Sequence, residues 1–337
     1  MMSLAALILL SLTQAGSDSA HRARELIEEL RSDNVEVRDR AWRRLKELGP
    51  GVLPELEKAA LDPDSEVAQR VRLLLQLHQV RLKLSPSTLA LFPDAADRIV
   101  SPVDRGCTEI FLKVGSDDRA SREELAFLAP RAILGAVTQT DLCGVLHVVV
   151  KFRLREASPQ VVGLLSHPEA YVAGQVVDAL EKLRPVDQIP AIVLAARHES
   201  AATREYAATL LGRLGSDAET PVLVALLKDP QRQVRSAAGE ALVDLEAKDR
   251  VSDLVGLLDF PASVHEALRL LGRLGAPEAL PSIRRLLREG GKRERGSAAD
   301  ALGVLGLREA IPDLLAALKD EEPEVQASAA RSLADLE

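Results

Sequence analysis

The sequence predicts an all-α protein, an α-solenoid (superhelix) of about ten helix pairs stacked in a row. One phrase, Leu-Gly-Arg-Leu-Gly or a close variant, recurs at intervals of 31, 29, 31 and 31 residues, ending at Gly215, Glu246, Gly275, Gly306 and Glu337. Prolines fall in step with it at Pro190, Pro221, Pro281 and Pro312. Hydrophobic residues make up 47% of the chain but aromatic residues only 2%, which suits helices packed closely rather than one deep core.

Each repeat is predicted to contain two helices. In the repeat that ends at Glu246, Pro221 opens the first helix, and Asp229-Pro230 ends it. We expect Asp229 to be the N-cap of the second helix and Pro230 its first residue. Apolar residues of the second helix are spaced by three and four, which indicates one buried face: Val234, Ala237, Ala238, Ala241, Leu242 and Leu245. Glycines at positions 215, 275 and 306 are expected to cap the helix ends.

The repeat pattern extends upstream with less regularity, and it divides the chain into four segments. Regular repeats cover residues 156–337, and N-terminal repeats cover residues 21–80. Between them, residues 81–155 hold two degenerate repeats, whose second helices are expected in CTEIFLKVG and DLCGVLHVVVKF. Residues 1–20 precede the first repeat.

These residues resemble HEAT repeats, particularly the short variety of about 30 residues in phycocyanobilin-lyase-like and other bacterial proteins. The V-R-x-x-A-x-x-A-L core is clear at Val234-Arg235 with Ala241-Leu242. It is partial at Glu294-Arg295 with Ala301-Leu302, and at Val325 with Ser332-Leu333. The resemblance covers nearly all of residues 21–337. It is specific for the fold and weak for function, because the same repeat serves many tasks.

A stack of such pairs is expected to expose its first helices on a convex side and its second helices on a concave side. A long groove of this kind suits a protein partner better than a small substrate. We therefore expect a non-catalytic scaffold for protein–protein interaction, without a cofactor. The alternative is an enzyme-associated HEAT protein, either a lyase-like subunit or a metal-dependent hydroxylase.

Candidate partner-binding residues lie at the starts of second helices. They are Tyr171, Arg204, Arg235, His265 and Arg295. Tyr171 is the best single aromatic anchor, since exposed tyrosines often dominate interfaces. The arginines also have a structural interpretation, in which Asp229 pairs with Arg235 and Glu289 with Arg295 to form a ladder joining neighbouring turns.

The pairs His198-Glu199 and His265-Glu266 resemble the metal-ligand pairs of HEAT-like deoxyhypusine hydroxylase. That family needs four such pairs in register, and His198-Glu199 lies several residues earlier in its repeat than His265-Glu266 does. We therefore predict no metal site, and we interpret these residues as polar positions of turns and first helical turns.

The net charge of −8 argues against a general nucleic-acid binder. Two basic clusters nevertheless occur in the sequence. They are interpreted as solvated helix faces, with an acidic protein segment or a lipid headgroup as the alternative target. One cluster contains Arg38, Arg40, Arg43, Arg44 and Lys46. The other contains Arg284, Arg285, Arg288, Lys292, Arg293 and Arg295.

Residues 1–20 resemble an export signal, with an apolar run from Leu4 to Leu10 followed by small residues. The predicted location is periplasmic or extracellular, with the cytoplasm as the alternative. The apolar run is too short for a stable membrane span of about 20 residues. At the other end no polar capping repeat follows the last helix, which raises the prospect of self-association through that repeat.

Cys107 and Cys143 are the only cysteines, too few for a zinc site, which needs about four ligands. They are interpreted either as two small buried residues or, in an exported chain, as a disulfide. Gly106 and Gly144 adjoin them and are expected to allow close helix approach.

Overall fold

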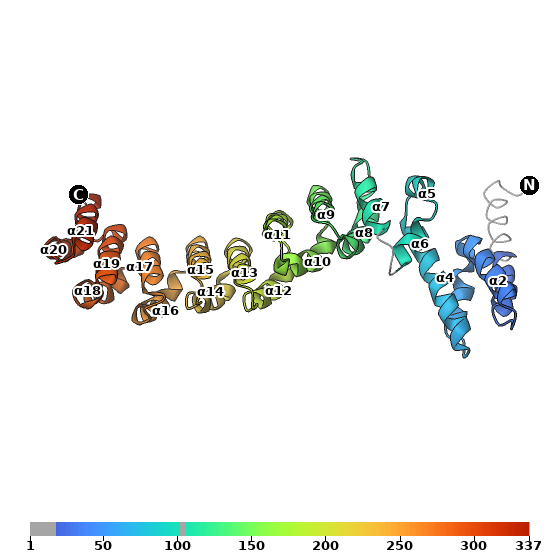
Figure 1. Ribbon diagram of the computed structural model, residues 1–337, viewed down its shortest axis with the longest axis horizontal. Helices are drawn as coiled ribbons and strands as arrows, with labels where there is room; N and C mark the ends of the chain where they lie inside the picture. Colours follow the sequence, from blue (N-terminus) through green and yellow to red (C-terminus); the bar gives the residue numbers. More distant parts are fainter. Residues whose placement is uncertain (1–17, 102–105, 337) are drawn as a thin grey trace, which may run out of the picture. The chain divides into compact units, whose positions relative to one another are not determined.

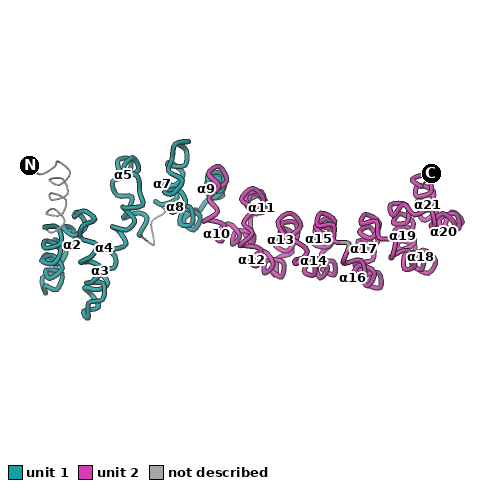
Figure 2. The backbone as a smooth tube through the Cα atoms, turned by 180° about the vertical axis from the view of Figure 1, so that it is seen from behind, with its two compact units in different colours: residues 1–148 teal, residues 149–337 magenta. Residues whose placement is uncertain are grey.

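The computed structural model describes residues 18–101 and 106–336. These residues fold into helices joined by short turns, and they contain no β-strand, so the predicted all-α class is confirmed. The chain divides into two compact units, Met1–Val148 and Val149–Glu337 (Figure 2). The boundaries predicted at residues 81 and 156 describe the regularity of the repeats rather than their packing, so they stay predictions. The predicted export signal falls on residues 1–20, of which only 18–20 are described.

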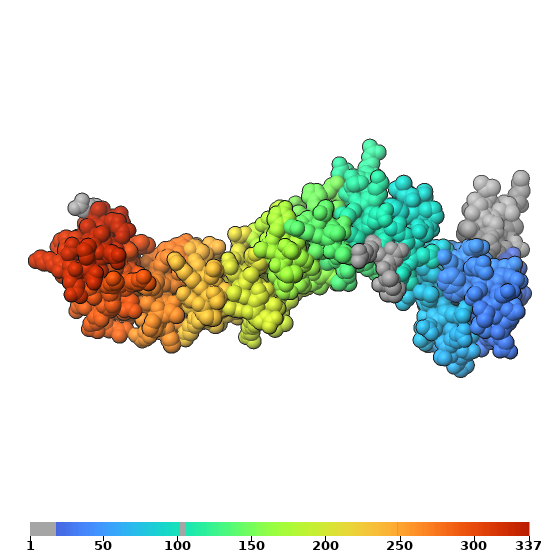
Figure 3. Space-filling model, viewed as in Figure 1, coloured from blue at the N-terminus to red at the C-terminus, as the bar shows by residue number. Residues whose placement is uncertain are grey.

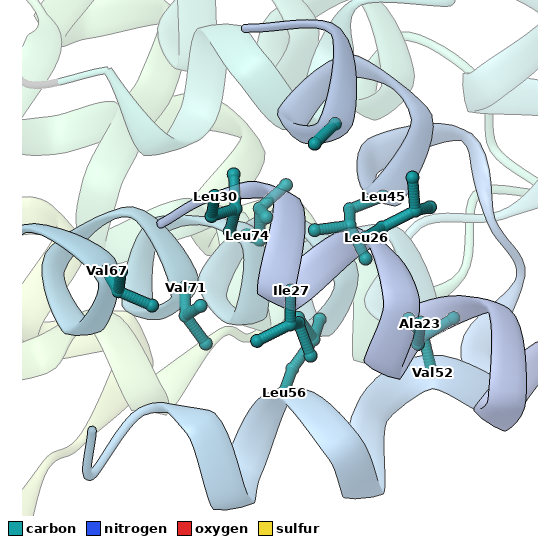
Figure 4. Close-up of a cluster of buried hydrophobic side chains, with 11 residues drawn as sticks. Ala23, Leu26, Ile27, Leu30, Leu45, Val52, Leu56, Val67, Val71 and Leu74 are labelled. Carbon is teal, nitrogen blue, oxygen red and sulfur yellow. The ribbon is translucent and has the colours of Figure 1, made fainter. Parts of the chain in front are cut away.

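The first unit begins with a helix over residues 18–29, followed by eight labelled helices, the last of which crosses the unit boundary. They are α2 Val35–Glu47, α3 Leu53–Ala59, α4 Ser65–Lys83, α5 Pro86–Leu91, α6 Ala95–Val100, α7 Gly106–Gly115, α8 Arg122–Gly135 and α9 Gln139–Lys151. Helices α7 and α9 confirm the second helices predicted for the two degenerate repeats. In the first repeats, Leu26 and Ile27 pack with Leu56 of α3 and with Val71 and Leu74 of α4 (Figure 4).

The second unit is a regular series of helix pairs in two rows (Figure 1). The first helices are α10 Ser158–Gly163, α12 Ile189–Ala195, α14 Thr220–Leu226, α16 Val251–Gly256, α18 Leu280–Glu289 and α20 Ile311–Ala317. The second helices are α11 Ala170–Leu183, α13 Ala201–Leu214, α15 Arg232–Asp244, α17 Val264–Arg273, α19 Lys292–Leu305 and α21 Pro323–Asp335. The space-filling view shows these repeats in chain order, each beside the next (Figure 3).

First helices begin as the prolines predict. Pro190, Pro221, Pro281 and Pro312 all occupy the first or second position of their helices, where the missing N–H has no helical partner to lose. A short 3₁₀ turn precedes each of these helices, as at Asp217–Glu219, and the repeat pattern did not predict it. Each first helix is therefore entered through a tight bend.

The start of α15 differs from the prediction. The helix begins at Arg232, with Gln231 rather than Asp229 as its N-cap. The backbone N–H of Gln231 donates a 2.9 Å hydrogen bond to the Asp229 carboxylate, which closes a turn around Pro230 before the helix starts. Asp229 therefore organises the turn between the two helices instead of capping the second one.

Second helices of neighbouring repeats approach each other closely. A Cβ atom added to Gly212 of α13 would lie 2.6 Å from the Cα of Ala241 in α15. Leu-Gly motifs at these helix ends thus serve packing as well as capping. Capping by left-handed backbone is confirmed at Gly275 (φ 63°) and Gly306 (φ 72°), whereas Gly215 ends its helix in an extended conformation.

Candidate functional site

Three of the predicted partner-binding residues form a column of arginines on the second helices of the second unit. Arg204, Arg235 and Arg295 each lie eleven residues before the end of their repeat phrase. The Nη1 atom of Arg235 donates to the carbonyl oxygens of Asp229 (2.7 Å) and Pro230 (3.0 Å) in its own turn. Arg204 and Arg295 donate to their own turns in the same way. Each arginine therefore fixes the turn that precedes its helix.

Two of these arginines, Arg204 and Arg295, also join neighbouring repeats. Arg204 donates from Nε (2.7 Å) and Nη2 (3.0 Å) to the carboxylate of Asp229 in the next repeat. Arg295 makes the equivalent pair of bonds to Asp320, both 2.8 Å long. The predicted pairs Asp229–Arg235 and Glu289–Arg295, each within one repeat, were wrong, because the observed pairs join an arginine to an aspartate of the next repeat. Each aspartate is bonded to an N–H of its own turn, and its carboxylate pairs with the arginine of the preceding repeat.

These pairs shift the acidity of the aspartates. Burial alone would raise the pKa of the Asp229 carboxyl, but hydrogen bonds from Arg204 and from the N–H of Gln231 outweigh it and hold this pKa below its usual value. For Asp320 the hydrogen bond from Arg295 is the dominant influence, and it lowers the pKa against a smaller effect of burial. Both aspartates are therefore charged partners at neutral pH.

The series of arginine–aspartate pairs is interrupted at the shortened repeat that ends at Gly275. Counting back from the repeat end, Val264 takes the position of the arginine. In the turn between its two helices, Phe260-Pro261 replaces the Asp229-Pro230 of the preceding repeat, so the aspartate has no counterpart there. No ion pair joins Arg235 to an acidic side chain in the described part of the chain.

The two His-Glu pairs occupy different structural positions. His198 lies in the turn before α13, and its Nδ1 accepts a 3.1 Å hydrogen bond from the N–H of Ser200. His265 is exposed on α17, one position past the arginine column, and its Nδ1 lies 2.7 Å from the hydroxyl of Ser297 on α19. Among residues 18–101 and 106–336, no three His, Cys, Asp or Glu side chains are grouped to hold a metal ion.

Tyr171 is 61% exposed on the first turn of α11. Its repeat-equivalent positions, thirteen residues before each repeat end, include Ala262, Arg293 and Glu324. We call the surface formed by the exposed first turns of α11, α13, α15, α17, α19 and α21 the second-helix face. The partner-binding roles of Tyr171, Arg204, Arg235, His265 and Arg295 stay predictions, and all five lie at the N-terminal ends of these helices.

A groove of about 640 Å³ opens on the second-helix face over α15, α17, α19 and α21. Four cations line it, and we call it the basic groove after them: Arg232, Arg235, Lys292 and Arg293. Sequence analysis had placed Lys292 and Arg293 in a basic cluster but missed Arg232. The signal for Arg232 is its place three residues before Arg235, the same offset that separates Lys292 from Arg295.

Arg295 of the second basic cluster belongs to the arginine column, and the structure splits the remaining residues into two parts. Arg284 of α18 pairs with Asp313 at 2.6 Å, and Arg285 pairs with Asp259 at 2.7 Å, so these first-helix arginines join repeats. Lys292 and Arg293 belong to α19 and are exposed in the basic groove. Only this second part is free to meet a partner's charges.

Cys107 and Cys143 are both free thiols in the structure, so the disulfide considered above is not formed there. Cys107 is buried in α7, with its Sγ atom 3.7 Å from the carbonyl oxygen of Leu128, and burial raises its pKa to about 12. Cys143 is half-buried in α9. Gly106 and Gly144 lie close to Arg98 and Leu112, as expected for tight helix approach.

The sequence profile of HEAT repeats matches residues 157–243, 189–264 and 254–334. Together these matches span just over half of the chain, so the protein belongs to the HEAT-repeat family. The matched region is the regular part of the second unit, which contains the arginine column and the basic groove. No curated protein sequence matches the chain.

Solved helical-repeat structures are similar to this chain at low sequence identity. A Kap121p mutant matches with a TM-score of 0.52 and 13% identity over 93% of this chain and 41% of that chain, which supports the solenoid fold. The complex of CpcE and CpcF of phycocyanin lyase from Nostoc sp. PCC7120 matches with a TM-score of 0.35 and 21% identity, over 62% of this chain and 86% of that one. Human deoxyhypusine hydroxylase matches with a TM-score of 0.32 and 16% identity, over 97% of this chain and 98% of that chain.

In the described ranges, no helix combines the length and apolar character that crossing a membrane requires.

Proposed function

We propose that this protein is a non-catalytic scaffold that binds a protein partner on the second-helix face of residues 149–337. The observation that carries the proposal is that some side chains at the helix starts of that face bind neighbouring repeats while others are exposed and have no such role. Arg204 and Arg295 are occupied by bonds between repeats, whereas Tyr171 and Arg293 are exposed at equivalent helix starts with no role in holding repeats together. Exposed aromatic and arginine side chains are the residue types that dominate protein interfaces.

The roles of the histidines support a non-catalytic function. His198 accepts a hydrogen bond that closes a turn, and His265 is bonded to Ser297 of the next repeat. A two-metal hydroxylase needs its His-Glu pairs in register. The two His-Glu pairs of this chain are out of register with each other. These contacts explain both histidines as parts of the repeat structure.

Affinity capture with the full chain tests the proposal. The wild type is compared with a face variant, Tyr171→Ala with Arg293→Ala, and with a control variant on first-helix elements, Leu194→Ala with Arg308→Ala. Leu194 is 68% exposed, so the control removes comparable side chains from first-helix elements of the repeats that directly follow those of Tyr171 and Arg293. We expect a saturable polypeptide partner that the wild type and the control retain and the face variant loses. Loss in the control with retention by the face variant would contradict the proposal.

We also propose that the chain is exported to the periplasm or the extracellular space. The support is the sequence of residues 1–20, an apolar run followed by small residues. Mass spectrometry of the N-terminal peptide of the native protein tests it. Export predicts a new N-terminus within the small-residue stretch that follows the apolar run, and an intact Met1 on the mature protein would contradict it.

A further inference from the structure

We infer that the basic groove binds an acidic segment of a polypeptide. This inference rests on the proposed scaffold function and names the chemistry of the partner. The groove draws its lining from four successive second helices, α15, α17, α19 and α21, so it runs across several repeats rather than into one. A surface of that kind fits an extended chain better than a single small ion.

Three of the four cations of the groove have no ion-pair partner within the described residues. Arg232, Lys292 and Arg293 are exposed, and across residues 18–101 and 106–336 none of the three forms an ion pair. On a chain of net charge −8, four cations gathered in one groove are a local reversal of sign. They also stand in the first turns of α15 and α19, where the helix dipole is positive and disfavours them. A bound anion would relieve both effects.

Arg235 gives the second, independent observation. In the preceding repeat and in the repeat two further on, the equivalent arginines Arg204 and Arg295 each hold a carboxylate of the following repeat with two hydrogen bonds. Arg235 keeps only the bonds to its own turn, and the turn of the next repeat reads Phe260-Pro261 in place of Asp229-Pro230. The guanidinium therefore faces the groove with donors that match a carboxylate in geometry.

The acidic residues of the groove do not cancel this charge. Glu266 accepts a hydrogen bond from Arg269, and Asp300 pairs with Arg331 at 3.4 Å. Glu324 is the one lining carboxylate without an ion pair in the described residues. The unpaired charge of the groove is thus positive, and it is complementary to carboxylates.

Helix spacing sets the length of the segment. Neighbouring packed helices lie roughly 8–10 Å apart, so the arginines of α15 and the cations of α19, two helices further on, are about 16–20 Å apart. An extended chain rises about 3.3 Å per residue, so about five or six residues bridge the two positions. We therefore expect a segment with acidic residues at both ends of such a stretch.

Fluorescence anisotropy of a labelled octaglutamate peptide with the full chain tests the inference. Arg235→Gln removes the charge, while glutamine is tolerated at this position: Gln326 is its equivalent in the last repeat and still donates to the carbonyl of Asp320 at 2.6 Å. A second variant, Arg232→Glu with Arg293→Glu, reverses charge at two exposed positions. Arg308→Glu, in the 3₁₀ turn before α20, is the matched control. Circular dichroism confirms that each variant is folded.

We expect octaglutamate to bind the wild type and the control equally, with affinity that falls as salt rises. Arg235→Gln should weaken binding several-fold, and the double charge reversal should weaken it about tenfold or more. Equal binding of octalysine, or octaglutamate binding unchanged in both variants, would overturn the inference. So would capture of phosphatidylserine vesicles through these residues without octaglutamate binding, which would indicate a lipid surface. If octaglutamate fails while the partner is still retained through Tyr171, the inference fails and the scaffold function stands.

Discussion

Arg204 and Asp229 lie 25 residues apart in the sequence and form a two-bond ion pair between consecutive repeats, 2.7 and 3.0 Å long. Their side chains are 14% and 6% exposed, so this pair is better shielded from water than an ordinary surface salt bridge. Arg204 simultaneously donates to two carbonyl oxygens of its own turn. One side chain thus ties together a turn, its helix and the next repeat.

The pair predicts a stability difference between two equivalent arginines. Arg204→Gln should lower the free energy of unfolding by about 1–2 kcal/mol, because it leaves the buried Asp229 carboxylate without its charged partner. Arg235→Gln should change it by less than about 0.5 kcal/mol, since Arg235 has no carboxylate to lose. Urea denaturation of both variants measures the difference. Equal losses would show that the bonds to the turn, and not the pair, carry the stability.

The lowered pKa of Asp229 predicts a stability loss in acid. A carboxyl whose pKa is lower in the folded state stabilises the fold above its usual pKa of 3.8, and this contribution disappears as the pH falls towards the lowered value. The unfolding midpoint of the wild type should therefore exceed that of Asp229→Asn by a constant amount above about pH 5. Below about pH 4 the gap should close. A gap that stays constant into strong acid would rule out the charged pair as its source.

Close packing of second helices predicts opposite effects of two glycine substitutions. Gly212→Ala should destabilise the protein by about 1–3 kcal/mol, because the new Cβ would meet the backbone of Ala241 at 2.6 Å. Gly174→Ala, in α11, has open space around the new Cβ and should stabilise by up to about 1 kcal/mol. Thermal unfolding of the two variants distinguishes them by sign. Similar changes in both would contradict the packing described here.

Burial predicts unequal thiol reactivity. Cys107 is buried and its pKa is raised to about 12, so its thiol should resist iodoacetamide in the folded protein at mildly alkaline pH. Cys143 is only half-buried and should be modified first. Peptide mapping before and after denaturation measures both sites. Rapid labelling of Cys107 in the folded state would show that α7 is not packed as described.

The helices could be predicted from the sequence because the repeat phrase carries their periodicity, their prolines and their glycine caps. The sequence could predict that arginines and aspartates form a ladder between repeats, but it could not predict which arginine pairs with which aspartate. Asp229 is six residues from Arg235 and 25 from Arg204, and only the stacking of repeats shows which arginine it meets. The basic groove escaped prediction for the same reason, since Arg232 and Arg293 lie 61 residues apart and meet only across two repeats.

The shortened repeat that ends at Gly275 shows most clearly where prediction of equivalent positions from the sequence fails. Counted back from the repeat end at Gly275, Val264 stands at the position of the arginine column and His265 one residue later. Sequence analysis named His265 beside Arg204, Arg235 and Arg295 as a candidate partner-binding residue at the start of a second helix. The structure separates it from them, because the helix end at Gly275, and not the helix start, fixes the register of α17.

Site-specific photo-crosslinking tests the central claim, recognition of a protein on the second-helix face, most directly. A photoreactive phenylalanine analogue replaces either Tyr171 on α11 or Leu194 on α12, which are 61% and 68% exposed. The account predicts that the probe at position 171 captures a polypeptide in the native cell fraction and that the probe at position 194 does not. Capture only at position 194 would contradict the account and place recognition on the first helices.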